Sequence, residues 1–192
     1  MRRYAMLLLV LVPMAATSTF AEEAHSSLDP NFRGPGSLQD ASPQRRTQLL
    51  SIFLNFPAAY WGWGGIPFGV GGRFYLPILH DGFVPQINDS FGIEVGADLI
   101  AIGGRYFGLG LDLPIEAMWA LHFSQRFAAY FKLGIAIEIH FGTTWCWAGV
   151  CNSGLWWSGI AGVGIIYKLT DSILFRLELG YPGLKIGLGF PL

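Results

Sequence analysis

Apolar and polar residues alternate with a period of two along most of the chain after residue 48. The clearest segment is 127–142, where every odd position is apolar and the even positions include Tyr130, Lys132, Glu138 and His140. A period of two sends successive side chains to opposite faces of a β-strand. This segment therefore predicts one long strand with an apolar face and a polar face.

The same alternation recurs in six other segments, at 66–78, 90–100, 108–122, 155–168, 172–180 and 184–190. The charged residues in the seven strands all lie on the face opposite the apolar row of their strand. They are Arg73, Glu94, Asp98, Asp112, Glu116, Lys132, Glu138, Lys168, Arg176, Glu178 and Lys185.

Two arrangements fit such strands: a soluble sandwich or lipocalin-like barrel with an apolar interior, or a membrane barrel with an apolar exterior. The charged faces are rich in glycine, at positions 92, 96, 110, 134, 162, 164, 187 and 189. A narrow barrel interior needs such small residues. The apolar rows are also long enough to span a bilayer, and aromatic residues lie near their ends, which favours the membrane barrel.

Barrels formed by one bacterial chain have an even number of strands, so an eighth strand is needed. The segment 49–56 supplies it, with Leu50, Ile52, Leu54 and Phe56 facing lipid. The alternative is a helix that begins at Ser42 and ends before Pro57. Even-number closure favours the strand. The predicted fold is all-β: a transmembrane antiparallel up-and-down β-barrel of eight strands.

Composition agrees with a membrane protein. The 192 residues are 52% hydrophobic and 13% charged, and the net charge is −1, which does not indicate a nucleic-acid partner. The 26 glycines argue against helices. A polytopic helical protein is the alternative, since residues 141–167 contain no charge, but Pro and Gly interrupt the uncharged stretches.

The first 21 residues have the features of a signal peptide for export. Arg2 and Arg3 precede a short apolar run at 6–12, and small residues at Thr19 and Ala21 mark a cleavage site. Residues 22–48 are polar and rich in Pro, Gly and Ser, so we expect a flexible periplasmic segment.

The barrel then occupies 49–192. With both ends periplasmic, the loops near 57–65, 101–107, 143–154 and 181–183 face outward.

The charged faces predict a network inside the lumen, to which His140 adds a partial charge. Five cations and six carboxylates nearly balance, which indicates a plugging network of ion pairs rather than an ion-selective pore. Glu94, Asp98, Asp112 and Glu116 could instead raise one another's pKa or bind a cation. We predict no metal, no cofactor and no catalytic residue.

The predicted outward loop 143–154 contains both cysteines of the chain. Cys146 and Cys151 predict one disulfide, since zinc binding would need more ligands than the nearby His140. Trp145, Trp147, Trp156 and Trp157 cluster around them. These tryptophans are either an interfacial aromatic belt or a patch that binds glycan, lipid or a partner protein.

Over residues 49–192 the strand pattern, with a last strand that ends near Phe190, resembles the small eight-stranded outer-membrane barrels of the OmpA/OmpX/OmpW-like group. The resemblance implies an outer-membrane location in a Gram-negative bacterium. The usual ending places the aromatic residue last, whereas Pro191 and Leu192 follow here. The resemblance is architectural, so no functional residue is carried over from the group.

His122 and Ser124 form a His-x-Ser arrangement, and the outer-membrane lipid A deacylases resemble this barrel class and use a His/Ser pair. The surrounding residues do not match that family. We therefore expect a non-enzymatic barrel with a structural, adhesion or envelope-interaction role through the disulfide-closed loop, in contact with outer-membrane lipid and an envelope protein or glycan. The alternatives are a narrow channel or hydrophobic-solute conduit, and a lipid-modifying enzyme.

Overall fold

The computed structural model describes residues 35–40, 42–58, 65–104, 108–141, 146–147, 150–151 and 154–192. The predicted signal peptide, the first part of the predicted flexible segment and Trp145 lie outside these residues. The strands are β1 (Leu49–Phe56), β2 (Gly65–Leu79), β3 (Asp89–Gly104), β4 (Gly108–His122), β5 (Phe127–Phe141), β6 (Cys146–Trp147), β7 (Val150–Cys151), β8 (Gly154–Lys168), β9 (Leu174–Tyr181) and β10 (Leu184–Pro191).

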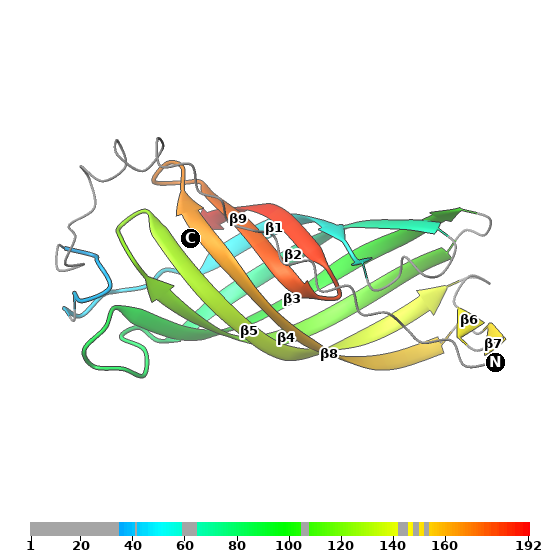
Figure 1. Cartoon of the computed structure of the whole chain (residues 1–192), viewed down its shortest axis with the longest axis horizontal. Helices are drawn as coiled ribbons and strands as arrows, with labels where there is room; N and C mark the ends of the chain where they lie inside the picture. The colour runs from blue at the N-terminus through cyan, green and yellow to red at the C-terminus, as the bar shows by residue number, and fades with distance from the viewer. Residues whose placement is uncertain are drawn as a thin grey trace, which may run out of the picture. The chain divides into compact units, whose positions relative to one another are not determined.

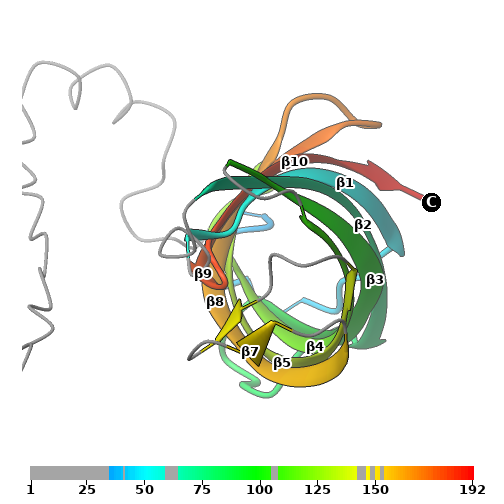
Figure 2. The same cartoon turned by 90° about the vertical axis from the view of Figure 1, so that its right-hand side faces the viewer.

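Eight of these strands form a closed antiparallel barrel in the order β1-β10-β9-β8-β5-β4-β3-β2 (Figures 1 and 2). The barrel closes where β1 pairs with β10, with Leu50 opposite Phe190. The strands β6 and β7 make a separate two-stranded hairpin between β5 and β8. The predicted eight-stranded up-and-down barrel is therefore confirmed. Segment 49–56 is a strand, so the helix alternative is wrong.

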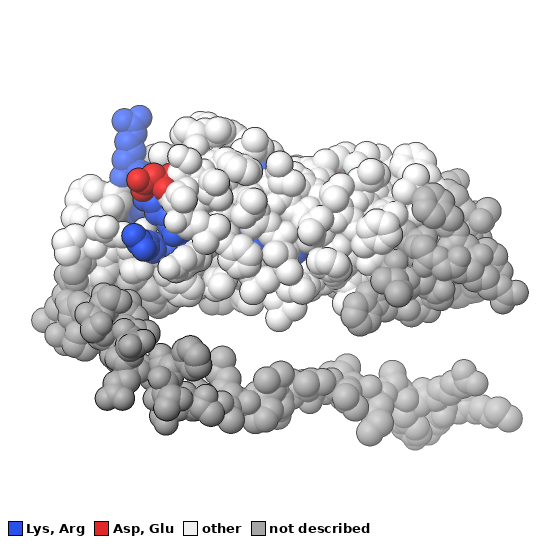
Figure 3. Space-filling view, turned by 90° about the horizontal axis from the view of Figure 1, so that it is seen from above, with Lys and Arg blue, Asp and Glu red and all other residues white. Residues whose placement is uncertain are grey.

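The burial of side chains is inverted relative to a soluble protein. Leu133 and Trp157 are 69% and 67% exposed on the outer wall, whereas Arg73 and Arg176 are 1% and 0% exposed inside. On the face shown in Figure 3, the described wall is almost entirely white, and the prominent charged side chains gather at one end. Apolar side chains gain by contact with lipid, and a closed barrel satisfies its backbone hydrogen bonds within itself. The barrel is therefore of the transmembrane type. Among the described residues, no helix is long and apolar enough to cross a membrane.

Glycines on the inner face make room for the large side chains of the lumen. A Cβ atom at Gly164 would lie 2.4 Å from Cζ of Tyr130, whose side chain is only 1% exposed. A Cβ at Gly96 would lie 2.7 Å from Cδ of Arg73. The glycine content of the charged faces thus follows from what the lumen contains.

The two ends of the barrel differ in what closes them. We call the end with residues 35–48 and the connections 80–88, 123–126 and 169–173 the N-terminal mouth. The opposite end, with the connections between β1 and β2, β3 and β4, β5 and β8, and β9 and β10, is called the loop end.

Candidate functional site

Arg176 of β9 lies at the centre of the buried network in the lumen. Its Nη1 donates to Glu94 Oε1 at 2.6 Å and to Ser51 Oγ at 2.8 Å, and its Nη2 donates to Glu178 Oε1 at 2.9 Å. The guanidinium carbon lies 4.9 Å from the centre of the Phe53 ring and 5.2 Å from that of Tyr130. One side chain thus joins β1, β3, β5 and β9 across the lumen.

Lys132 of β5 is the second centre of the network. Its Nζ lies 2.6 Å from Glu94 Oε2, 2.8 Å from Glu116 Oε2 and 3.1 Å from Glu178 Oε2. A buried ammonium group has three donors, and each of them faces a carboxylate here. Tyr130, on the same strand, donates to Glu178 Oε1 at 2.8 Å. In the sequence, Tyr130 lies on the polar face of segment 127–142 together with the charged residues. This pattern indicates that its side chain points into the lumen, where the contact forms.

Arg73 and Lys185 form the remaining part of the network nearer the loop end. Arg73 binds both oxygens of Asp98, with Nη1 2.7 Å from Oδ1, and its Nε lies 3.4 Å from Glu116 Oε2. Lys185 Nζ lies 3.3 Å from Asp98 Oδ2. Each of the carboxylates Glu94, Asp98, Glu116 and Glu178 therefore contacts at least two cations.

Strand register explains why the carboxylates of β3 and β4 need cations from other strands. Glu94 is directly opposite Glu116, and Asp98 is directly opposite Asp112, in the β3–β4 ladder. Like charges directly opposite each other on neighbouring strands repel. The cations come from the flanking strands β2 and β5 and from β9 and β10 farther round the barrel, and they neutralise the carboxylates of β3 and β4.

Lys168 does not join this network. Its Nζ lies 2.7 Å from Oδ1 of Asp171, and both side chains are at least a third exposed at the N-terminal mouth. This hydrogen bond from Lys168 lowers the pKa of Asp171. The prediction that Lys168 is part of the lumen network is wrong, because β8 ends at this residue and its side chain reaches the turn before β9. Among the described residues, four of the five predicted cations therefore face the six carboxylates of the lumen.

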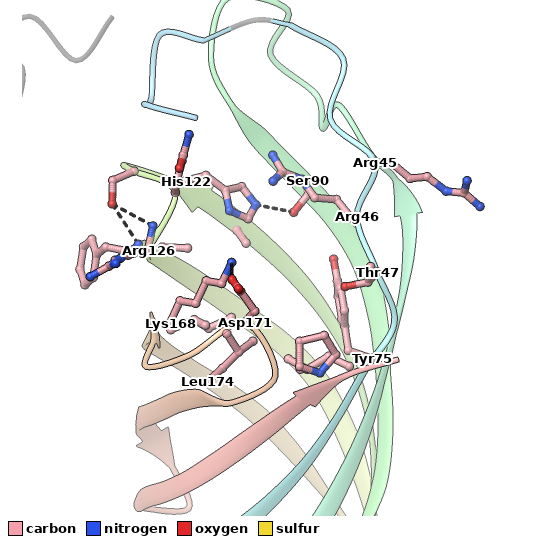
Figure 4. Close-up of a pocket in the computed structure, with 18 of the residues that line it drawn as sticks. Arg45, Arg46, Thr47, Tyr75, Ser90, His122, Arg126, Lys168, Asp171 and Leu174 are labelled. Atoms are coloured by element: carbon pink, nitrogen blue, oxygen red, sulfur yellow. Dashed lines mark hydrogen bonds and ion pairs between the residues drawn. The ribbon is translucent and has the colours of Figure 1, made fainter. Parts of the chain in front are cut away.

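A pocket of about 390 Å³ opens at the N-terminal mouth (Figure 4). Tyr75, Met118 and Ala120 line it and belong to the buried apolar cluster that also includes Leu49 and Tyr130. Arg45, Arg46, Arg126 and Lys168 also line it, and the side chain of Arg45 extends outward in Figure 4. The pocket is thus a basic vestibule whose inner end is closed by large side chains.

Residues 35–48 are attached to this mouth, although the sequence predicts a flexible segment up to residue 48. The backbone N–H of Arg46 donates to His80 Nδ1, and the Arg46 guanidinium donates to Asn88. The backbone N–H of Asn88 in turn donates to the carbonyl of Leu38 at 2.7 Å. The composition of the segment shows its low apolar content, which predicts flexibility. Composition carries no information about hydrogen bonds to the connection 80–88, which is distant in the sequence.

Asp40 holds this segment in a tight local turn. Its carboxylate accepts from the backbone N–H of Gly36 at 2.5 Å and from Ser42 Oγ at 2.5 Å. The hydrogen bond from Gly36, followed by those from Ser42, lowers the pKa of Asp40. Gly36 has a φ of +74°, a conformation that glycine adopts without strain.

His122 and Ser124 are not paired with each other. His122 Nε2 lies 2.9 Å from Ser90 Oγ (Figure 4), whereas Ser124 Oγ accepts from the backbone N–H groups of Arg126 and Phe127. Ser124 therefore closes the β4–β5 turn. The His-x-Ser spacing is a feature of a strand end followed by a turn, and only the β3–β4 pairing brings Ser90 to His122.

Asp112, Glu138 and His140 meet at the loop end of the lumen. One ligand atom from each of them lies within 4.8 Å of the others, and all three residues are buried. His140 Nε2 lies 3.2 Å from Glu138 Oε2. The sequence predicts these residues as members of the charge network, but it does not predict that they form a separate group.

The backbone register places Cys146 directly opposite Cys151 in the β6–β7 hairpin. The side chains of these two residues and of Trp147 lie outside the described residues. Trp156 and Trp157 begin β8 and are 51% and 67% exposed. The predicted disulfide stays a prediction.

No protein-family model matches the chain, and no curated protein matches it significantly. Among solved structures, it is similar to the outer membrane protein Ail of Yersinia pestis in a phospholipid bilayer nanodisc, with 12% identity and a TM-score of 0.45. The match covers 77% of this chain and 100% of Ail. By its own strand order and inverted burial, the chain has the architecture of the small eight-stranded outer-membrane barrels.

Proposed function

We propose that the protein is a non-enzymatic barrel of the outer membrane whose lumen is closed and whose loop end engages an envelope protein or glycan. The main observation in support of the closed lumen is that large charged side chains fill it and are at most 1% exposed: Arg73, Arg176, Glu94 and Glu116. An eight-stranded barrel has an interior just wide enough for its side chains. A lumen filled by such a network supports a structural or surface-display role more than conduction.

Planar-bilayer recording of the refolded protein tests the closed lumen. We expect no discrete openings from the wild-type barrel. Discrete, reproducible single-channel openings would support the narrow-channel alternative and contradict the proposal. A heat-modifiability gel, in which folded and boiled samples migrate differently, shows in parallel that the protein used is folded.

We propose that Cys146 and Cys151 form a disulfide that closes the outward loop. Directly opposed residues of an antiparallel ladder have Cα atoms about 4.5–5.5 Å apart, which lies within the range that a disulfide spans. Mass spectrometry of alkylated protein, with and without reduction, tests this pairing. Labelling of both cysteines without reduction would contradict it.

The proposed role of the loop end is tested by measuring adhesion, not the stability of the barrel. Cells that carry the barrel with Cys146→Ser and Cys151→Ser, or with Trp156→Ala and Trp157→Ala, are compared with wild type for adhesion to glycan-coated and protein-coated surfaces. We expect reduced adhesion with an equal amount of folded barrel. Equal adhesion of all forms would exclude this surface as the site.

The export signal and the non-enzymatic character are parts of the same proposal. N-terminal sequencing of the outer-membrane form is expected to begin at Glu22. Lipid A and phospholipids are expected to be unchanged in His122→Ala and Ser90→Ala variants relative to wild type. A changed lipid profile that depends on His122 would support the lipid-modifying alternative, in which Ser90 rather than Ser124 would be the partner of His122.

A further inference from the structure

The group at the loop end differs from the rest of the lumen in how its charges are arranged. Glu138 and His140 are two residues apart on β5, so both side chains are on the inner face of the barrel. Asp112 of β4 is directly opposite Glu138, and Gly110 is directly opposite His140. The position facing His140 on β4 therefore has no side chain.

Asp112 is buried without a partner for one of its oxygens. The residue is 5% exposed, and its Oδ1 accepts no hydrogen bond from any described residue. Its cross-strand neighbours are Asp98 on one side and Glu138 on the other, so both are carboxylates. A buried, ionised carboxylate between two others is costly unless a cation or a proton compensates it.

The four lumen cations that the structure describes contact other carboxylates. Arg73 and Lys185 bind Asp98, and Lys132 and Arg176 bind Glu94 and Glu178. None of the described lysines and arginines lies within ion-pair distance of Asp112. What approaches Asp112 instead is a carboxylate and an imidazole, both of which are metal ligands.

We propose that Asp112, Glu138 and His140 bind one divalent cation of the zinc class at the loop end of the lumen. Zn²⁺ takes imidazole nitrogen and carboxylate oxygen at about 2.0–2.2 Å, so two ligands of one ion lie at most about 4 Å apart. The three ligand atoms lie within 4.8 Å of one another, so side-chain movements of about 1 Å or less bring them into range. Water completes the coordination.

The imidazole selects the class of ion. Hard cations such as Mg²⁺ and Ca²⁺ prefer oxygen ligands only, whereas Zn²⁺, Co²⁺ and Mn²⁺ accept a nitrogen together with carboxylates. The two positive charges of the ion offset the two carboxylates that face each other across the β4–β5 ladder. Binding therefore couples these two strands at the end of the barrel from which the outward loops emerge.

Zinc titration of the folded barrel tests the proposal. The full chain is refolded in detergent micelles, freed of metal with a chelator and titrated with ZnCl₂ by calorimetry, and Co²⁺ absorption reports on the ligands. We expect one Zn²⁺ per barrel. Asp112→Asn and His140→Gln are each expected to weaken binding at least about tenfold. The matched control, Asp171→Asn, removes an exposed carboxylate at the opposite end and should leave the affinity unchanged.

A stability readout separates loss of the site from loss of the fold. Zn²⁺ is expected to raise the unfolding temperature of the wild type but not of Asp112→Asn. In the absence of metal, Asp112→Asn should be at least as stable as the wild type, because it removes a like-charge contact. Absence of saturable Zn²⁺ binding by the wild type, or equal affinity in both ligand variants and the wild type, would overturn the proposal.

Discussion

The middle of the lumen and its loop end each contain two carboxylates that face each other on neighbouring strands, but the groups that approach these carboxylates differ. In the middle, Glu94 and Glu116 face each other across β3 and β4, but Lys132 contacts both of them. At the loop end, Asp112 and Glu138 face each other across β4 and β5, and His140 Nε2 lies 3.2 Å from Glu138 Oε2. A buried carboxylate contributes to stability where a fixed cation reaches it, as Lys132 does for Glu94 and Glu116. Asp112, which none of the described lysines and arginines reaches, becomes a candidate ligand instead.

The largest effect is expected from removing the central cation. Arg176→Met leaves Glu94 and Glu178 without one of their partners in a fully buried site, and loss of one partner of a buried pair costs about 3–5 kcal/mol. Urea unfolding in micelles measures it. Arg126→Met, at an exposed turn residue, is the control and should change the free energy of unfolding by less than about 1 kcal/mol. Equal effects of the two variants would show that the network does not stabilise the barrel.

Crowding in the middle of the lumen is tested by adding one methyl group at either of two positions of β8. Gly164→Ala would place a Cβ 2.4 Å from Tyr130, and overpacking of this kind costs about 1–3 kcal/mol. Gly159→Ala, on the outer wall with no atom within 4 Å of its Cβ, should be close to neutral. The difference in unfolding free energy between the two variants is the measurement. If the two variants have the same unfolding free energy, Tyr130 can move aside and the middle of the lumen is not crowded.

The comparison itself is tested by removing one charge from each region of β4. Glu116→Gln loses its contacts with Lys132 and Arg73 and should cost about 1–3 kcal/mol. Asp112→Asn relieves repulsion from Asp98 and Glu138 and, without metal, should be neutral or stabilising by less than about 1 kcal/mol. If both variants destabilise the metal-free barrel equally, the two regions do not differ in the way described.

The smallest effect concerns Asp40 at the N-terminal mouth. Its pKa is lowered in the folded state, so the stabilisation it gives is present above its ordinary pKa and is lost as the pH falls through the folded value. Below about pH 4 we therefore expect a lower protection factor at the Gly36 amide, which is its hydrogen exchange compared with the intrinsic rate at the same pH. Asp40→Asn should show a low protection factor at every pH. Protection that persists in acid would show that the carboxylate does not hold the turn.

The sequence by itself determined the barrel, because lipid and lumen impose a period of two that is readable at every strand. It also determined that charges and glycines share the inner face, since a narrow interior admits few large side chains. Even-number closure assigned residues 49–56 to a strand, and the β1–β10 pairing agrees with it.

Only the tertiary structure decided which charges meet. Register brings Asp112 to Glu138 and Ser90 to His122, from residues that are 26 and 32 positions apart in the chain. It also places Lys168 at the rim and ties Arg46 to Asn88. The pattern of alternation fixes the face on which a side chain lies but not its level along the barrel axis. That level decides whether a buried charge meets an opposite charge or a like charge.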